Sequence, residues 1–117
     1  MKTITVSIGR NVGRVRMHDE DWNDFQLDLR TALERLDVEP YFTGTGFGPW
    51  HDLDLLEESF TIVGGLPDEA PRVDLVHELS RLAFVYSQEA IALTIGDTLF
   101  ATASAYETFG STGGGAE

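Results

Sequence analysis

Two short acidic stretches of this 117-residue chain begin with histidine, and both contain side chains that could hold a divalent cation. The first is residues 18–21 (His-Asp-Glu-Asp) and the second is residues 51–54 (His-Asp-Leu-Asp). Carboxylate oxygens beside an imidazole are ligands that Mg²⁺, Ca²⁺ or Mn²⁺ can use. Neither stretch has the spacing of a known metal motif, and acids at a helix start are favoured by the helix dipole alone. We therefore predict no metal site and no cofactor.

A small-molecule pocket is the second chemistry that the residue types allow. Aromatic and polar side chains occur together at Tyr41, Trp50, His51 and Asp52, and His77 lies in a later predicted helix. Apolar and aromatic side chains with a few polar groups are typical of ligand pockets, and histidine can exchange protons near neutral pH. The alternative is that the aromatic residues lie in the core and that His77 packs at an interface. We take these five residues as the candidate ligand-binding set.

Covalent catalysis and phosphate binding have little support in the sequence. The chain has no cysteine, which excludes thiolate nucleophiles, disulfides and iron–sulfur clusters. Residues 43–48 (Thr-Gly-Thr-Gly-Phe-Gly) lack the Lys-Ser/Thr of a phosphate-binding loop and precede no helix, so they predict a bent strand. We predict no catalytic residue.

Charge is divided unevenly along the chain. Residues 1–17 hold four basic residues and no acid, whereas residues 18–117 hold all 20 Asp and Glu with four Arg. The net charge of −12 disfavours direct binding to nucleic acid or anionic lipid, and it favours a basic protein partner. We expect Arg10, Arg14 and Arg16 to neutralise acids of the same chain or of a second copy. The remaining outer surface is then more acidic than the net charge suggests.

Four residues form the candidate interaction surface. Asp21, Asp24 and Asp28 are spaced i, i+3 and i+7, which places them along one edge of a helix. Phe84 falls outside the apolar stripe of the second predicted helix, where a helix covered on one face needs no aromatic side chain. The alternative is that the three aspartates form a solvated helix face.

The hydrophobic pattern predicts a strand, a helix, two strands, a second helix and a final hairpin. The expected ranges are 3–9, 19–36, 41–50, 59–63, 71–86, and 90–95 with 98–102 around the turn at 96–97. This order predicts an α+β, ferredoxin-like βαββαβ fold with an additional C-terminal strand, an antiparallel sheet and two helices on one face. Residues 1–103 are the expected domain, and residues 104–117 are an expected flexible tail rich in Gly, Ser and Thr.

Several short motifs carry a resemblance to a known family, and they span most of residues 4–95. They are residues 6–11 (VSIGRN), 19–25 (DEDWNDF), 45–50 (TGFGPW), 57–62 (EESFTI) and 86–91 (YSQEAI). With these motifs the chain resembles a group of small bacterial and phage proteins of ferredoxin-like fold whose function is unknown. Residues 33–37 (LERLD) depart from the proline-containing Arg/Phe stretch of that group. The resemblance implies the fold, transfers no catalytic residue, and suggests a dimer, because relatives of this fold often pair through the open sheet face.

The leading hypothesis is a non-enzymatic, acidic binding or assembly protein, homodimeric and acting on a basic partner, as in a phage or mobile-element accessory protein. The alternative is a small enzyme or small-molecule binder with a pocket between sheet and helix or at a dimer face. No apolar run approaches the ~18 residues that span a membrane, and the first residues alternate instead of forming a signal-peptide block. We therefore expect no membrane association and a cytoplasmic location.

Overall fold

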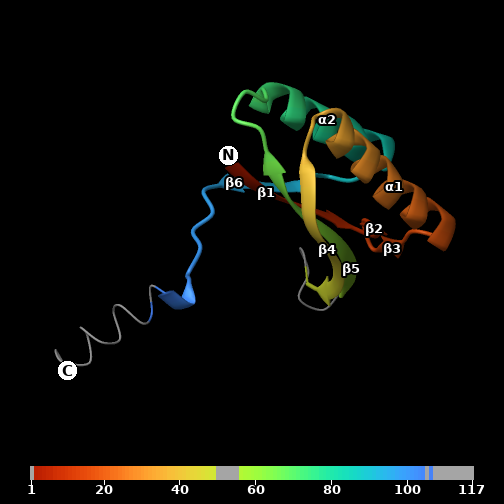
Figure 1. The fold of residues 1–117 in the computed structure, drawn as a ribbon. Coiled ribbons are helices and arrows are strands. Elements are labelled where there is room, and N and C mark those ends of the chain that lie inside the picture. The colour runs from red at the N-terminus through yellow and green to blue at the C-terminus, as the bar shows by residue number, and fades with distance from the viewer. Residues whose placement is uncertain (1, 50–55, 105, 107–117) are drawn as a thin grey trace.

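The computed structural model describes residues 2–49, 56–104 and 106. In chain order the elements are β1 (Lys2–Gly9), β2 (Asn11–Val12), β3 (Val15–Arg16), α1 (Asp19–Arg35), β4 (Glu39–Gly48), β5 (Glu57–Leu66), α2 (Arg72–Val85) and β6 (Ala92–Gly96). Both helices lie on the same side of the sheet (Figure 1).

The main sheet has the strand order β4-β5-β1-β6, and each neighbouring pair is antiparallel. Strand β1 therefore lies between β5 and β6, with one helix in each crossover, which is the split βαβ arrangement. The predicted ferredoxin-like α+β class, with two helices on one face of an antiparallel sheet, is confirmed.

Alternation along the central strands decides which sheet face the helices cover. Ile4, Val6 and Ile8 of β1 are fully buried, and Val6 pairs with Ile62 of β5. Side chains of successive strand residues point to opposite faces, so the threonines and serine between them lie on the open face. Helix α1 contributes Phe25 and Leu29 to the core, and α2 contributes residues of the same kind, Leu75, Leu79 and Leu82.

Strand β5 is longer than the sequence predicted. The expected range, 59–63, ended at Gly64-Gly65, but the strand runs from Glu57 to Leu66. Gly64 pairs with both neighbouring strands, and it packs closely against the chain that follows α1. A Cβ atom at Gly64 would come within 2.7 Å of the carbonyl oxygen of Glu39 and 2.9 Å of the Val38 side chain. This glycine therefore permits a close approach and does not end the strand.

The additional C-terminal strand expected over residues 98–102 is absent, since β6 is the last strand among the described residues. The physical reason lies in two contacts with β1. Lys2 Nζ donates to Asp97 Oδ1 at 2.5 Å, and the Thr98 hydroxyl bonds that of Thr3. Both contacts continue the β1–β6 register past Gly96, so the chain goes on beside β1 and does not turn back at residues 96–97 as a hairpin would. The segment then runs away from the sheet (Figure 1).

Two other stretches complete the fold. The basic connection after β1 contains the small hairpin of β2 and β3, and Gly13 between them has a φ of 61°. At the C-terminal end, residues 103, 104 and 106 are helical, and residues 107–117 of the expected tail lie outside the described residues. The division at residues 103 and 104 stays a prediction.

Candidate functional site

A buried arginine organises one end of the sheet. Arg10 is only 5% exposed, and its guanidinium donates from Nε to the carbonyl oxygen of Met17 (2.9 Å) and from Nη1 to Glu58 (3.0 Å). Its Nη2 also bonds Asp19, in the first turn of α1, and this hydrogen bond lowers the pKa of Asp19 below its usual range. Arg10 thus ties β1, β5 and the start of α1 together.

Glu58 accepts from several donors around this arginine. Arg16 Nη2 lies 3.3 Å from Glu58 Oε1, and Trp22 Nε1 donates to Glu58 Oε2 at 3.2 Å. For Arg10 and Arg16, the expected neutralisation of acids in the same chain is confirmed. A carboxylate held by three donors is better suited to positioning α1 than to proton transfer. We therefore assign this cluster a structural role.

The acidic ridge, which we define as Asp21, Asp24 and Asp28, lies on the outer side of α1. All three side chains belong to exposed residues. Tyr86, directly after α2, donates a hydrogen bond from its hydroxyl to Asp28 Oδ2. Burial, this hydrogen bond and the negative charges of the three aspartates together raise the pKa of Tyr86 well above its usual range. The ridge therefore runs beside the C-terminal end of α2.

Phe84 stands at that same helix end and is 86% exposed. The last turn of α2 contains no basic residue, so the negative end of the helix dipole is not offset there. Arg81, the basic side chain whose charge reaches Tyr86, is bound to Glu78 at 2.5 Å. The candidate surface thus combines negative charge from α1, the negative end of α2 and an exposed aromatic ring.

The structure describes two of the five candidate ligand-binding residues, Tyr41 and His77. Trp50, His51 and Asp52 lie outside the described residues. Tyr41 is half exposed at a bulge in β4, an edge strand of the sheet. His77 lies on the exposed side of α2 and lines a shallow groove with Val73, Val76 and other residues of that helix, and Tyr41 is not part of it. The structure therefore does not bring Tyr41 and His77 together in that groove, and the set stays a prediction.

Among the described residues, the imidazole of His77 has no hydrogen-bonded carboxylate, and no three His, Asp or Glu side chains are grouped as metal ligands. His18 caps the start of α1, and Asp19 beside it is bound to Arg10. The second candidate metal stretch, at 51–54, lies outside the described residues. In the described chain, neither helix combines the length and the apolar character that crossing a membrane requires.

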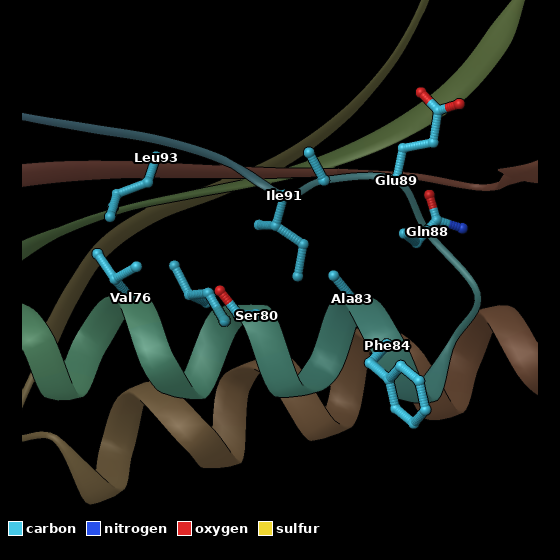
Figure 2. A pocket seen from close by; sticks show the side chains of 10 residues that line it. Val76, Ser80, Ala83, Phe84, Gln88, Glu89, Ile91 and Leu93 are labelled. Atoms are coloured by element: carbon cyan, nitrogen blue, oxygen red, sulfur yellow. The ribbon is translucent and has the colours of Figure 1, made fainter.

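A groove that the sequence did not indicate separates α2 from the chain entering β6 (Figure 2). Its volume is about 620 Å³. It is lined mostly by small and apolar side chains, among them Val76, Leu79, Ala83, Ala90, Ile91 and Leu93. The alternation of Ile91, Leu93 and Ile95 was the available signal, but the predicted hairpin would have covered this edge. With residues 98–102 elsewhere, the groove is open.

Comparison with known proteins places the fold. No protein-family model and no curated protein matches the chain. Among solved structures, the C-terminal domain of the MgtC protein from Mycobacterium tuberculosis is similar, with 13% identity, a TM-score of 0.55, and coverage of 86% of this chain and 94% of that one. A phage SAM lyase without ligand matches at 17% identity and a TM-score of 0.58, covering 85% of this chain and 84% of the lyase.

The same class of phage enzyme in complex with S-methyl-5′-thioadenosine matches at 16% identity and a TM-score of 0.55, covering 82% of this chain and 80% of that one. These likenesses, together with the strand order, define the chain as a small ferredoxin-like α+β domain. At such low identities they show the fold alone. The narrower resemblance to a bacterial and phage family of unknown function stays a prediction.

Proposed function

We propose that this chain is a non-enzymatic binding or assembly domain that holds a basic protein segment on the acidic ridge and Phe84. The observation that carries the proposal is the division of charges. Arg81, whose charge reaches Asp28, is bound to Glu78, whereas Asp21, Asp24 and Asp28 are exposed on α1 and Phe84 is exposed at the end of α2.

The ion pairs explain why the acidic charge remains available. Arg10 and Arg16 bind Glu58, Lys2 binds Asp97, and Arg81 binds Glu78. Of these basic side chains, Arg81 interacts with Asp28 of the ridge through its charge, and its pairing with Glu78 offsets that charge. Among the described residues, the hydroxyl of Tyr86 also donates to Asp28, without neutralising it. Carboxylates left in this state attract basic partners and accelerate their association.

The exposed ring of Phe84, at the end of α2 beside which the ridge runs, favours arginine over lysine in such a partner. A planar guanidinium can bind a carboxylate with two parallel hydrogen bonds and can also stack on an aromatic face. Aromatic side chains are enriched in interfaces, and Phe84 is exposed. We therefore propose an arginine-rich segment with apolar residues between the arginines.

Charge also separates this proposal from nucleic-acid binding. A surface with this sign repels phosphates, and binding to nucleic acid relies on basic side chains that neutralise them. A phage or mobile-element accessory role would fit an acidic domain that occupies a basic groove on another protein, and we include it as the finer form of the proposal.

Small-molecule binding through Tyr41, Trp50, His51, Asp52 and His77 remains the alternative. A phage SAM lyase of the same fold binds S-methyl-5′-thioadenosine, so this nucleoside is a reasonable first probe. A rise in melting temperature with the nucleoside, lost in His77→Ala, would favour the alternative. No rise at saturating nucleoside would leave it without support.

The test of the main proposal uses a fluorescently labelled peptide of alternating arginine and leucine, read by anisotropy. Asp21→Asn, Asp24→Asn and Asp28→Asn together should weaken binding by roughly 10-fold or more, as expected for the loss of three charge-assisted contacts. The control variant carries Glu34→Gln, Glu39→Gln and Glu69→Gln, which remove the same charge from exposed residues elsewhere. Equal weakening in both variants would show nonspecific attraction and would overturn the assignment to the ridge.

A further inference from the structure

A short apolar segment near the C-terminal end of the described chain is exposed to solvent. Leu99 is 92% exposed and Phe100 is 83% exposed. Both lie in residues 98–102 (Thr-Leu-Phe-Ala-Thr), where β-branched and aromatic residues favour a strand. This segment, which we call the C-terminal arm, has the composition of a strand but pairs with no strand in the described structure.

A free strand edge and an open groove lie next to each other elsewhere in the same chain. Strand β6 pairs with β1 along one side only, through residues such as Leu93 opposite Val6, and its other edge carries no partner among the described strands. The groove between α2 and β6 lies beneath this edge. Figure 2 shows Ile91 and Leu93 pointing toward Val76 and Ala83 across it.

The structure explains why the arm does not fill its own groove. Asp97 is bound by Lys2, and Thr98 is bound by Thr3, so the arm starts on the β1 side of β6. The free edge of β6 faces away from β1. The arm of one copy is therefore directed away from its own groove. Among the described residues, each copy offers a strand-like segment outside the sheet, with Leu99 and Phe100 exposed, and a free edge of β6.

We propose that two copies of this chain associate by exchanging C-terminal arms, each arm adding a strand to the free edge of β6 in the other copy. Main-chain hydrogen bonds to β6 provide the pairing, and one of the two large side chains enters the groove. Because neighbouring strand residues point to opposite faces, either Leu99 or Phe100 faces the groove and not both. Reciprocal exchange closes the assembly as a twofold dimer.

The response to salt distinguishes dimer formation through the arms from binding of a basic partner. Each copy has a net charge of −12, so two copies repel, and screening by salt should strengthen their association through an apolar contact. Binding of a basic peptide to the acidic ridge should weaken under the same change. Phe84 borders both surfaces, but neither test substitutes it, so the response to salt and the two sets of variants distinguish failure of one from failure of the other.

The test measures the mass in solution by light scattering at about 0.05 and 0.5 M salt. The full chain should reach twice the 12.9 kDa of one copy, more completely at the higher salt. Leu99→Ser with Phe100→Ser, or Val76→Glu in the groove, should raise the dimer dissociation constant by roughly 10-fold or more. Leu99→Ser and Phe100→Ser are also tested singly. The single substitution that raises the dimer dissociation constant more identifies the side chain that enters the groove.

Val73→Glu is the matched control, since Val73 lies on the same helix, is 77% exposed, lines the neighbouring shallow groove and is not among the residues that line the groove beside β6. It should leave the mass unchanged. Mixing the arm variant with the Val76→Glu variant should restore partial association, because one intact arm then meets one intact groove. A monomeric wild-type chain would overturn the exchange and would fit docking within one copy. Unchanged mass in both variants, or no rescue on mixing, would also overturn the exchange and would indicate another interface between copies.

Discussion

The hydroxyl of Tyr86 donates a hydrogen bond to the carboxylate of Asp28, and this contact joins the end of α2 to the acidic ridge of α1. Phe84 precedes Tyr86 by two residues, which is about 200° around a helix, so its exposed ring lies at the same end of α2 but borders the groove beside β6. Stacking of Tyr86 on Phe25, with ring centroids 4.4 Å apart, holds the phenol in place from the core side. The interaction surface is thus built on packed elements and not on a loop.

Tyr86 makes stability sensitive to alkaline pH. Because burial and the bond to Asp28 raise the pKa of Tyr86 in the folded state, its contribution to stability is complete below about pH 10 and is lost as the pH rises from there. Tyr86→Phe removes this group and should cost about 1 kcal/mol at neutral pH. The free-energy difference between wild type and variant, from urea melts, should shrink above about pH 10. A difference that stays constant up to about pH 11 would contradict the account.

Arg10 and Arg16 share Glu58 but should differ in their importance for stability. The Arg10 side chain is 6% exposed, and Arg10→Met leaves Glu58 short of a buried partner, which should cost about 2–4 kcal/mol in the free energy of unfolding. The Arg16 side chain is 64% exposed, so Arg16→Met should cost less than about 1 kcal/mol. Thermal or urea melts measure both, and similar losses would show that burial does not govern this cluster.

Gly64 and Gly46 offer a second matched pair. A Cβ atom at Gly64 would lie 2.7 Å from the Glu39 carbonyl oxygen, whereas one at Gly46 would meet nothing within 4 Å. Gly64→Ala must therefore displace the chain entering β4 and should destabilise by about 1–3 kcal/mol. Gly46→Ala should be neutral to slightly stabilising, within about 1 kcal/mol. If urea melts show that Gly64→Ala lowers the free energy of unfolding no more than Gly46→Ala does, the close contact between Gly64 and the chain that follows α1 is wrong.

Local patterns were sufficient to predict most of the fold. Alternation of Ile4, Val6 and Ile8 predicted both β1 and its buried face, and the apolar spacing around Phe25 and Leu29 predicted α1. These features depend on residues close in sequence. The exposure of the aspartates and of Phe84 also follows from helix spacing, so the sequence alone indicated that surface.

Long-range contacts decided what the sequence could not show. The path after β6 depends on Asp97 and Thr98 meeting Lys2 and Thr3, each pair 95 residues apart. Turn chemistry at residues 96–97 predicted a hairpin because it reports only local preference. The expected strand 59–63 left out Glu58, which lies in β5, and its partner Arg10 is 48 residues away in the sequence. The open groove beside β6 is a consequence of the first of these contacts.

The salt dependence of peptide binding tests the central claim most directly. Affinity of the wild-type chain for the arginine–leucine peptide should fall by roughly 10-fold or more between about 0.05 and 0.5 M salt, and the fall should be much smaller after Asp21→Asn, Asp24→Asn and Asp28→Asn. An affinity that does not change with salt, or an equal fall in the substituted chain, would contradict binding of a basic partner at the acidic ridge.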